Sequence, residues 1–289
     1  MHITNLVSDI YDVVRHKDGW FNEQLATDFS RELGLKLVET SKPRTEAPRL
    51  RLSQLGPQCP RALWHSIHTP ELAEPFPPWA LVKFTYGHIL EALLISMAKS
   101  AGHEVLGEQD ELTLDGVLGH RDCVLDGNVV DVKSCSSRQF QKYKDGSISL
   151  PGNDSFGYLD QLDGYVVASL DDPLVRNKSS GFILAIDKTL GHICLHEHHI
   201  REDSIRNRIR SYKEIVSRGI SPGCTCGTVP DGKSGNIKLD VRASYSGFKY
   251  CCNPRLRTFI YASGPVYLTK VVRKPDVMEV DKYGKIVYT

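Results

Sequence analysis

The chain has 289 residues, 40% of them hydrophobic and 25% charged, and a formal net charge of +1, values that are ordinary for a soluble globular protein. The length is enough to bury a full hydrophobic core, either in one large domain or in one domain with an appendage. No apolar run approaches the ~20 residues needed to cross a bilayer, and the N-terminus lacks the pattern of a signal peptide. We therefore expect a cytoplasmic protein without a membrane partner.

The first hundred residues predict helices interrupted by loops. An amphipathic opening that includes Ile10 and Val14 is followed by a polar stretch over 39–49, for which we expect a loop. Pro60 suits the first turn of a helix, and the proline cluster at 75–78 breaks the chain again. Apolar residues recur at helical spacing over 79–99, and Gly102 is placed to cap that helix.

The next part of the chain alternates between strand and helix patterns. A Gly- and Pro-containing loop over 144–153 leads into an expected helix over 154–170, and a charged helix is expected over 199–217. The first three of the expected strands form a meander. Strands are expected over 104–114, 119–125, 129–133, 181–187 and 192–196. Helix, meander, helix and further strands in this order predict an α/β fold.

The C-terminal part differs from the rest in composition and charge. Residues 221–289 are rich in Gly, Pro and Cys, with an extended region over 261–272. From residue 201 onward 17 Lys and Arg stand against 8 Asp and Glu, whereas the first 200 residues hold 19 and 27. An acidic part that gathers metal ions joined to a basic part that holds phosphates is what a nucleic-acid enzyme would need. Chance segregation of charge is the alternative interpretation.

The most informative segment runs from Gly119 to Lys133. Asp126-Gly127-Asn128 is strong turn chemistry between apolar runs and predicts a hairpin that folds Asp122 back toward Asp131. Residues two apart in a strand share a face, so Asp131 and Lys133 point the same way while Val132 points into the core. Two carboxylates and an ammonium at one place suit a hard divalent cation and an activated water, which indicates a metal-dependent nuclease.

Other polar side chains extend this constellation. A carboxylate at Glu91, on the helix before the sheet, can reach the first metal from behind. Gln161 and Tyr165 are four apart on the next helix, so they share a face and can hydrogen-bond a scissile phosphate or brace Lys133. The backbone carbonyl of Val132 is a further candidate ligand. Taken one at a time, each of these residues also fits an ordinary turn, ion pair or solvated helix face.

The ordered series resembles a known superfamily. Asp122-x8-Asp131-x-Lys133 is similar to the PD-(D/E)xK nuclease motif. With Gly87-x-x-x-Glu91, Gly119-His-x-Asp122, Asp131-Val-Lys-Ser134 and Gln161-x-x-x-Tyr165 it resembles the RecB-type branch, which includes lambda-exonuclease-like enzymes and the exonucleases of CRISPR adaptation.

The resemblance implies a restriction-endonuclease-like core, a central mixed β-sheet flanked by helices. It also implies Mg²⁺ or Mn²⁺ held by Glu91, Asp122 and Asp131, with Lys133 as the catalytic lysine. Some relatives have His at the Glu91 position, so His88 is an alternative ligand. We expect an N-terminal helical and loop segment over 1–50, the nuclease core over 51–220, and the Cys-containing basic appendage over 221–289 packing on that core.

The chain contains eight cysteines, some of which could bind a second, structural metal. In an intracellular chain, Cys224-Thr-Cys226 and Cys251-Cys252 indicate metal more than disulfides. Cys59-Pro-Arg61 resembles the N-terminal signature of iron–sulfur members of this branch, in which one early cysteine joins three late ones around a [4Fe–4S] cluster. The usual late spacing is missing here, so the set would be Cys59, Cys224, Cys226 and Cys251 or Cys252. Zinc and a metal-free remnant are the alternatives, and any such metal would be structural.

The expected function is a Mg²⁺- or Mn²⁺-dependent DNA exonuclease of phage or recombination–repair type, acting in the cytoplasm, that of the host if phage-encoded. Its partners would be DNA, single- or double-stranded with ends preferred, and recombination or replication proteins. The rivals are a structure-specific endonuclease on the same fold and a non-catalytic nucleic-acid-binding module. Candidate phosphate contacts are Arg61, Ser134, Lys233, Lys238, Arg242, Lys249, Arg255 and Arg257, with Trp64, Tyr245 and Phe248 as candidate stacking surfaces.

Overall fold

The computed structural model describes residues 1–16, 19–42 and 47–288 and divides the chain into two compact units. Unit 1 comprises residues 1–46, 51–56 and 77–207, and unit 2 comprises 47–50, 57–76 and 208–289. The division differs from the expected boundaries, because residues 57–76 group with the C-terminal region. Helix α7 (Glu202–Ser217) contains the second boundary.

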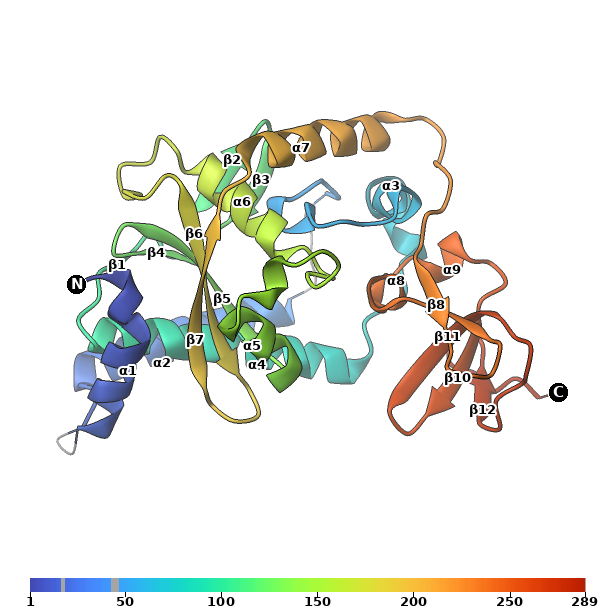
Figure 1. Cartoon of the computed structure of the whole chain (residues 1–289), viewed down its shortest axis with the longest axis horizontal. Coiled ribbons are helices and arrows are strands. Elements are labelled where there is room, and N and C mark those ends of the chain that lie inside the picture. Colours follow the sequence, from blue (N-terminus) through green and yellow to red (C-terminus); the bar gives the residue numbers. More distant parts are fainter. Residues whose placement is uncertain (17–18, 43–46, 289) are drawn as a thin grey trace. The chain divides into compact units, whose positions relative to one another are not determined.

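Unit 1 is built around a five-stranded sheet in the order β1-β4-β5-β6-β7. Its strands are β1 (Val105–Leu106), β4 (Cys123–Leu125), β5 (Asn128–Cys135), β6 (Ser180–Asp187) and β7 (Ile193–His199). β5 and β6 pair in parallel and the other neighbours are antiparallel, so the sheet is mixed. Helices flank it on both faces (Figure 1), which confirms the predicted α/β class.

The alternation of side chains along the strands assigns the helices to the two faces. Phe182, Leu184 and Ile186 join the core formed with α1 (Leu6–Arg15) and α4 (Pro78–Ser100). On the opposite face Gly181 meets Leu162 and Val166 of α6 (Tyr158–Ala168). A Cβ on residue 181 would lie 2.8 Å from both side chains, so glycine is required for this close approach. The remaining helical elements of unit 1 are α2 (Glu23–Ser41), α5 (Ser137–Lys144), and the 3₁₀ turns Ile3–Asn5, Leu52–Gln54 and Ser147–Ser149.

Helix α4 begins after Pro77 and ends as predicted near Gly102, which has φ +83°. By length and composition α4 could cross a membrane, contrary to the expectation that no segment could. Its last turns nevertheless contribute Leu94, Ile95 and Ala98 to the core of unit 1. In this part of α4 the apolar residues are therefore buried against the sheet.

Two expectations for unit 1 were wrong. The predicted meander is divided, because the segments over 104–114 and 119–125 each form two strands. β2 (Glu111–Leu114) and β3 (Val117–His120) make a separate two-stranded sheet. The expected loop over 39–49 begins later than predicted, because Glu39 to Ser41 belong to α2; residues 43–46 lie outside the described part.

Unit 2 contains a five-stranded antiparallel sheet in the order β12-β10-β11-β9-β8, of which only an extended region was expected. Helix α3 (Pro60–His68) starts at the predicted proline. Among the described residues of this unit, one buried cluster has Leu239, Ala243 and Leu256 at its centre. The other elements of unit 2 are β8 (Thr228–Pro230), β9 (Ile237–Leu239), α8 (Val241–Tyr245), α9 (Lys249–Cys252), β10 (Arg257–Tyr261), β11 (Gly264–Lys270), β12 (Met278–Val280) and the 3₁₀ turn Pro70–Leu72.

Candidate active site

The central feature of the site is strand β5, which carries Asp131 and Lys133. The hairpin that precedes it forms as predicted: Asp126 and Gly127 both have positive φ, and Cys123 pairs with Val130. Asp131 is completely buried on the face of the sheet that α6 covers, and Lys133 Nζ lies 2.7 Å from Asp131 Oδ2. Val132 points into the opposite core, as the alternation required.

Asp122 lies between β3 and β4 and folds back to β5. Its Oδ2 accepts a hydrogen bond from the Val132 N–H at 2.7 Å, so the two acids are held at adjacent positions. Arg121 fixes this turn from inside. Its fully buried guanidinium pairs with Asp110 at 2.7 Å and with Asp172 at 2.6 Å.

The electrostatics of the site reflect crowding of like charges. Burial and then the negative charge of Asp131 raise the pKa of Asp122 to about 8. Burial also raises the pKa of Asp131, although the ammonium of Lys133 opposes it. Burial alone would lower the pKa of Lys133, but the carboxylates of Asp131 and Asp122 outweigh it and raise that pKa. The lysine is therefore a fixed cation beside two carboxylates that are costly to ionise together.

Glu91 reaches the site from α4, and a residue that sequence reasoning missed holds it there. Glu91 Oε1 accepts a hydrogen bond from Gln109 Nε2 at 2.8 Å. Gln109 has φ +58°, and its backbone N–H donates to the Asp122 carbonyl oxygen at 3.1 Å. Gln109 Oε1 accepts from Lys36 at 3.0 Å. The turn over 107–110, predicted as strand interior, thus contacts two of the three proposed metal ligands.

Gln161 and Tyr165 lie on one face of α6, as predicted. Gln161 Nε2 donates to Asp131 Oδ1 at 3.2 Å and lies 2.8 Å from Tyr165 Oη. Tyr165 is 4% exposed, which favours bracing over direct contact with a large substrate. Tyr158, which the sequence did not single out, places its ring 5.3 Å from Lys133 Nζ. The ammonium group of Lys133 is therefore held between the carboxylate of Asp131 and the ring of Tyr158.

The donor chemistry of this group fits a hard divalent cation. Glu91, Asp122 and Asp131 offer carboxylate oxygens, the ligands that Mg²⁺ and Mn²⁺ prefer. Asp131 Oδ2 is buried and, apart from its ion pair with Lys133, receives no hydrogen bond of acceptable geometry from the described residues. The alternative ligand His88 lies with Nδ1 3.9 Å from Glu91 Oε2. All of these groups, the Val132 carbonyl and His88 included, remain predictions as ligands.

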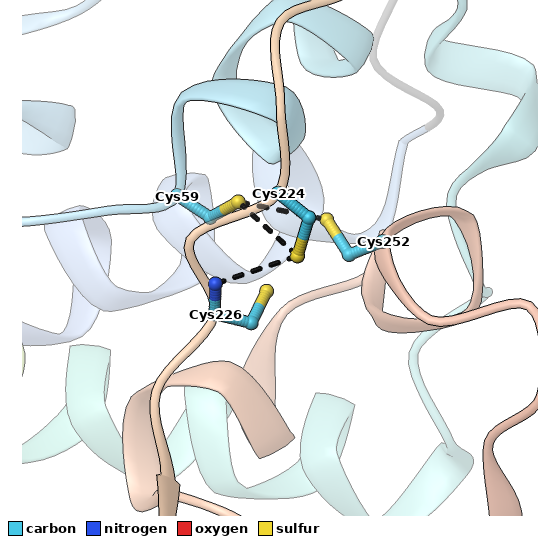
Figure 2. A group of neighbouring side chains, drawn as sticks. All are labelled: Cys59, Cys224, Cys226 and Cys252. Carbon is cyan, nitrogen blue, oxygen red and sulfur yellow. Dashed lines mark hydrogen bonds between the residues drawn. The ribbon is translucent and has the colours of Figure 1, made fainter. Parts of the chain in front are cut away.

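Four cysteines of unit 2 come together in a second site (Figure 2). The Sγ atoms of Cys59, Cys224, Cys226 and Cys252 lie within 4.8 Å of one another and could hold a metal ion. This resolves the open choice in favour of Cys252, since Cys251 Sγ lies instead 3.9 Å from the Leu72 carbonyl oxygen. Hydrogen bonds from the Cys226 and Cys252 thiols lower the pKa of Cys59.

Some of the candidate phosphate contacts already bind other residues of the protein, and others are exposed or half-buried. Lys249 is buried and paired with Glu74, which corrects its prediction as a phosphate contact. Arg257 makes two 2.7 Å hydrogen bonds to Glu279, and Arg61 Nε donates to the Pro222 carbonyl oxygen at 2.9 Å. Arg255 is exposed and Ser134 is half-buried beside Lys133.

The expected stacking surfaces also have partners within unit 2. Trp64 stacks on His68 with ring centroids 4.3 Å apart and donates its indole N–H to the Arg218 carbonyl oxygen. Phe248 stacks on His65 at 6.1 Å. Tyr245 is exposed.

Comparisons with known proteins give only distant likenesses. No family model matches the chain, and no curated protein does. Among solved structures, the crystal structure of SSO0001 is 17% identical with a TM-score of 0.41, over 78% of this chain and 93% of that chain. An alkaline exonuclease from Laribacter hongkongensis is 10% identical with a TM-score of 0.39, over 59% of this chain and 87% of that chain. The same exonuclease in complex with dAMP gives the same identity and TM-score, over 59% and 89%.

Proposed function

We propose that the protein is a divalent-metal-dependent nuclease that hydrolyses phosphodiester bonds in DNA, with an exonuclease as the preferred form. The observation that carries the proposal is the meeting of Asp122, Asp131 and Lys133 on β5 and the adjoining turn, with Glu91 and Gln161 beside them. Burial and the neighbouring charge of Asp131 raise the pKa of Asp122, and burial raises that of Asp131, which is unfavourable in a purely structural role. The two carboxylates are favourable where a cation completes the site.

The residues take distinct parts in the reaction. A bound Mg²⁺ or Mn²⁺ would polarise the phosphate and supply a water deprotonated near neutral pH. Glu91, Asp122 and Asp131 would hold that ion, with the Val132 carbonyl as a further ligand. Lys133, which keeps its proton, would orient the attacking water and offset the charge that develops on the phosphate. Gln161, which donates to both Asp131 and Tyr165, would keep Asp131 in place.

Two features support nucleic acid as the substrate and an end-directed reaction. In unit 2 Lys and Arg outnumber Asp and Glu by 17 to 8, which gives that unit a surplus of positive charge for a polyanion. The preference for ends rests on the motif series, which resembles the branch that includes lambda-exonuclease-like enzymes. Phage DNA metabolism and recombination or repair are the settings in which such an activity is used.

The test is digestion of end-labelled linear DNA and of covalently closed circular DNA, each with Mg²⁺, Mn²⁺ or a chelator. An exonuclease degrades the linear substrate alone and only with metal. Nicking or linearisation of the circle would favour the endonuclease instead. Binding of DNA without cleavage under every metal condition would favour the non-catalytic module.

Specificity of the test comes from matched variants. Asp131→Ala and Lys133→Ala should both reduce cleavage by about 100-fold or more, whereas Lys142→Ala should not, because Lys142 lies on α5 and donates to the Asn153 carbonyl oxygen. If Asp131→Ala cleaves as fast as the wild type, the assignment of the site is wrong.

A further inference from the structure

The four-cysteine group of unit 2 has a geometry that distinguishes between metal centres. Cys59 Sγ lies 3.9 Å from Cys224 Sγ and 3.7 Å from Cys252 Sγ, and all four sulfur atoms lie within 4.8 Å of one another. These separations exceed a disulfide bond, and all four cysteines are free. The sulfur atoms are therefore gathered without being covalently joined.

A single tetrahedral ion explains these distances. Four thiolates at ~2.3 Å from one Zn²⁺ form a tetrahedron whose edges are about 3.8 Å long. A [4Fe–4S] cluster binds each thiolate at a different iron, and its cysteine sulfurs point away from the cluster centre and stand roughly 6 Å apart. The 4.8 Å limit on every pair does not fit the cluster that the family resemblance implies.

The backbone around the cysteines is arranged for bound thiolates. The Thr225 N–H donates to Cys59 Sγ at 3.3 Å and the Cys226 N–H to Cys224 Sγ at 3.4 Å. Such amide donors offset the negative charge of a four-thiolate site and orient the ligands. Gly227 follows directly, and a Cβ there would collide with the Asp240 carboxylate, which caps α8. The backbone next to Cys226 is therefore positioned by its close contact with Asp240, independently of a metal.

The location of the ligands defines what the ion would do. Cys59 precedes α3, Cys224 and Cys226 lie before β8, and Cys252 ends α9, so one ion would join three separate segments of unit 2. Binding of one ion by ligands from separate segments adds its free energy to the stability of the folded chain.

We propose that Cys59, Cys224, Cys226 and Cys252 bind one structural Zn²⁺, in place of an iron–sulfur cluster. All four coordination positions are filled by thiolates, which leaves none for water or substrate, so the ion is structural. This inference goes beyond the proposed nuclease activity and does not depend on it.

The test is the metal content of the full chain, produced with both iron and zinc in the medium and purified without oxygen. We expect about one zinc per chain, little iron, and no broad absorbance near ~400 nm of the kind iron–sulfur thiolates give. Iron with that absorbance, a single iron, or four free thiols with no metal would each overturn the proposal.

Adjacent cysteines provide the matched control. Cys252→Ser should weaken zinc binding by more than about tenfold in competition with a chromophoric chelator, whereas Cys251→Ser should leave it unchanged. Replacement of zinc by Co²⁺ in the wild-type protein tests the geometry without any variant. The intense visible bands of tetrahedral cobalt thiolate are expected, and a spectrum of octahedral cobalt would contradict the site.

Discussion

Replacing Asp122 by asparagine tests two effects of its negative charge separately: the loss of folding stability that the charge causes, and the cleavage activity that depends on it. Asp122 Oδ2 accepts the Val132 N–H at 2.7 Å, and the side-chain oxygen of asparagine can accept the same hydrogen bond. The substitution therefore keeps the turn and removes one negative charge. We expect Asp122→Asn to stabilise the metal-free protein at pH 8 and to abolish metal-dependent cleavage.

The magnitude follows from the pKa of Asp122, which burial and Asp131 raise from 3.8 to about 8. Ionising such a group at pH 8 costs at most about 5 kcal/mol. Because Lys133 and Asp131 share the titration, we expect about 1–3 kcal/mol to be recovered. The folded state holds the proton more tightly than the unfolded state does. Wild-type stability should thus fall between about pH 4 and about pH 8, and the variant should lack this fall.

The assay is denaturant unfolding of both proteins across this pH range, with chelator and with Mg²⁺. In chelator the difference in unfolding free energy should be near zero at pH 4 and largest at pH 8. Mg²⁺ should stabilise the wild type more than the variant, because the ion binds the folded carboxylates. DNA cleavage by the variant should be lower by about 100-fold or more.

Asp172 provides a control, because its pKa is shifted in the opposite direction to that of Asp122. Its pKa is lowered, because the Leu174 N–H and the Arg121 guanidinium outweigh burial. Asp172→Asn should therefore destabilise the protein at pH 8, by about 1 kcal/mol or more. If Asp122→Asn is instead destabilising at pH 8 in chelator, the carboxylate of Asp122 has a structural role, and its ionisation does not lower the stability of the folded protein.

Three further predictions concern residues around the same site and core. Lys133→Ala should reduce cleavage by about 10²–10⁴-fold while Mn²⁺ binding, followed calorimetrically, is retained; loss of binding would make Lys133 structural. Gln109→Ala frees Glu91 and should weaken apparent Mn²⁺ affinity by about tenfold, and an unchanged affinity would show that Glu91 does not bind the ion. Gly56→Ala should destabilise unit 1 by about 1–3 kcal/mol, because its Cβ would collide with the Phe156 carbonyl oxygen; an unfolding curve identical to the wild type would contradict this packing.

The parts of the site that depend on local rules could be predicted from the sequence. Asp126-Gly127 requires two positive φ angles, and this alone folds Asp122 toward β5. The period of two then places Asp131 and Lys133 together, and the helical period aligns Gln161 with Tyr165. None of these steps needs knowledge of a distant contact.

The rest depends on contacts between segments far apart in the chain. Gln109 has a positive φ in a segment whose sequence predicts one continuous strand. In this conformation its backbone N–H donates to the Asp122 carbonyl oxygen and its side-chain amide donates to Glu91. Lys249 reads as a surface cation, yet its partner Glu74 is 175 residues away. Cys251 and Cys252 are adjacent, and only the direction of the short α9 decides which sulfur faces Cys59.

The buried Arg121 links the two halves of the proposed active site before any cation binds. It follows β3 directly and precedes Asp122, and its Nη1 donates to Ser169 Oγ at 3.2 Å. Ser169 Oγ in turn donates to the Tyr165 carbonyl oxygen at 2.8 Å, on the helix that carries Gln161. A buried guanidinium is costly unless its partners are fixed, so this chain of contacts holds the turn and α6 in one arrangement. The carboxylates and the polar face of α6 are therefore pre-positioned by groups that take no part in the chemistry, which is the condition under which a weakly held Mg²⁺ can still be bound in a defined geometry.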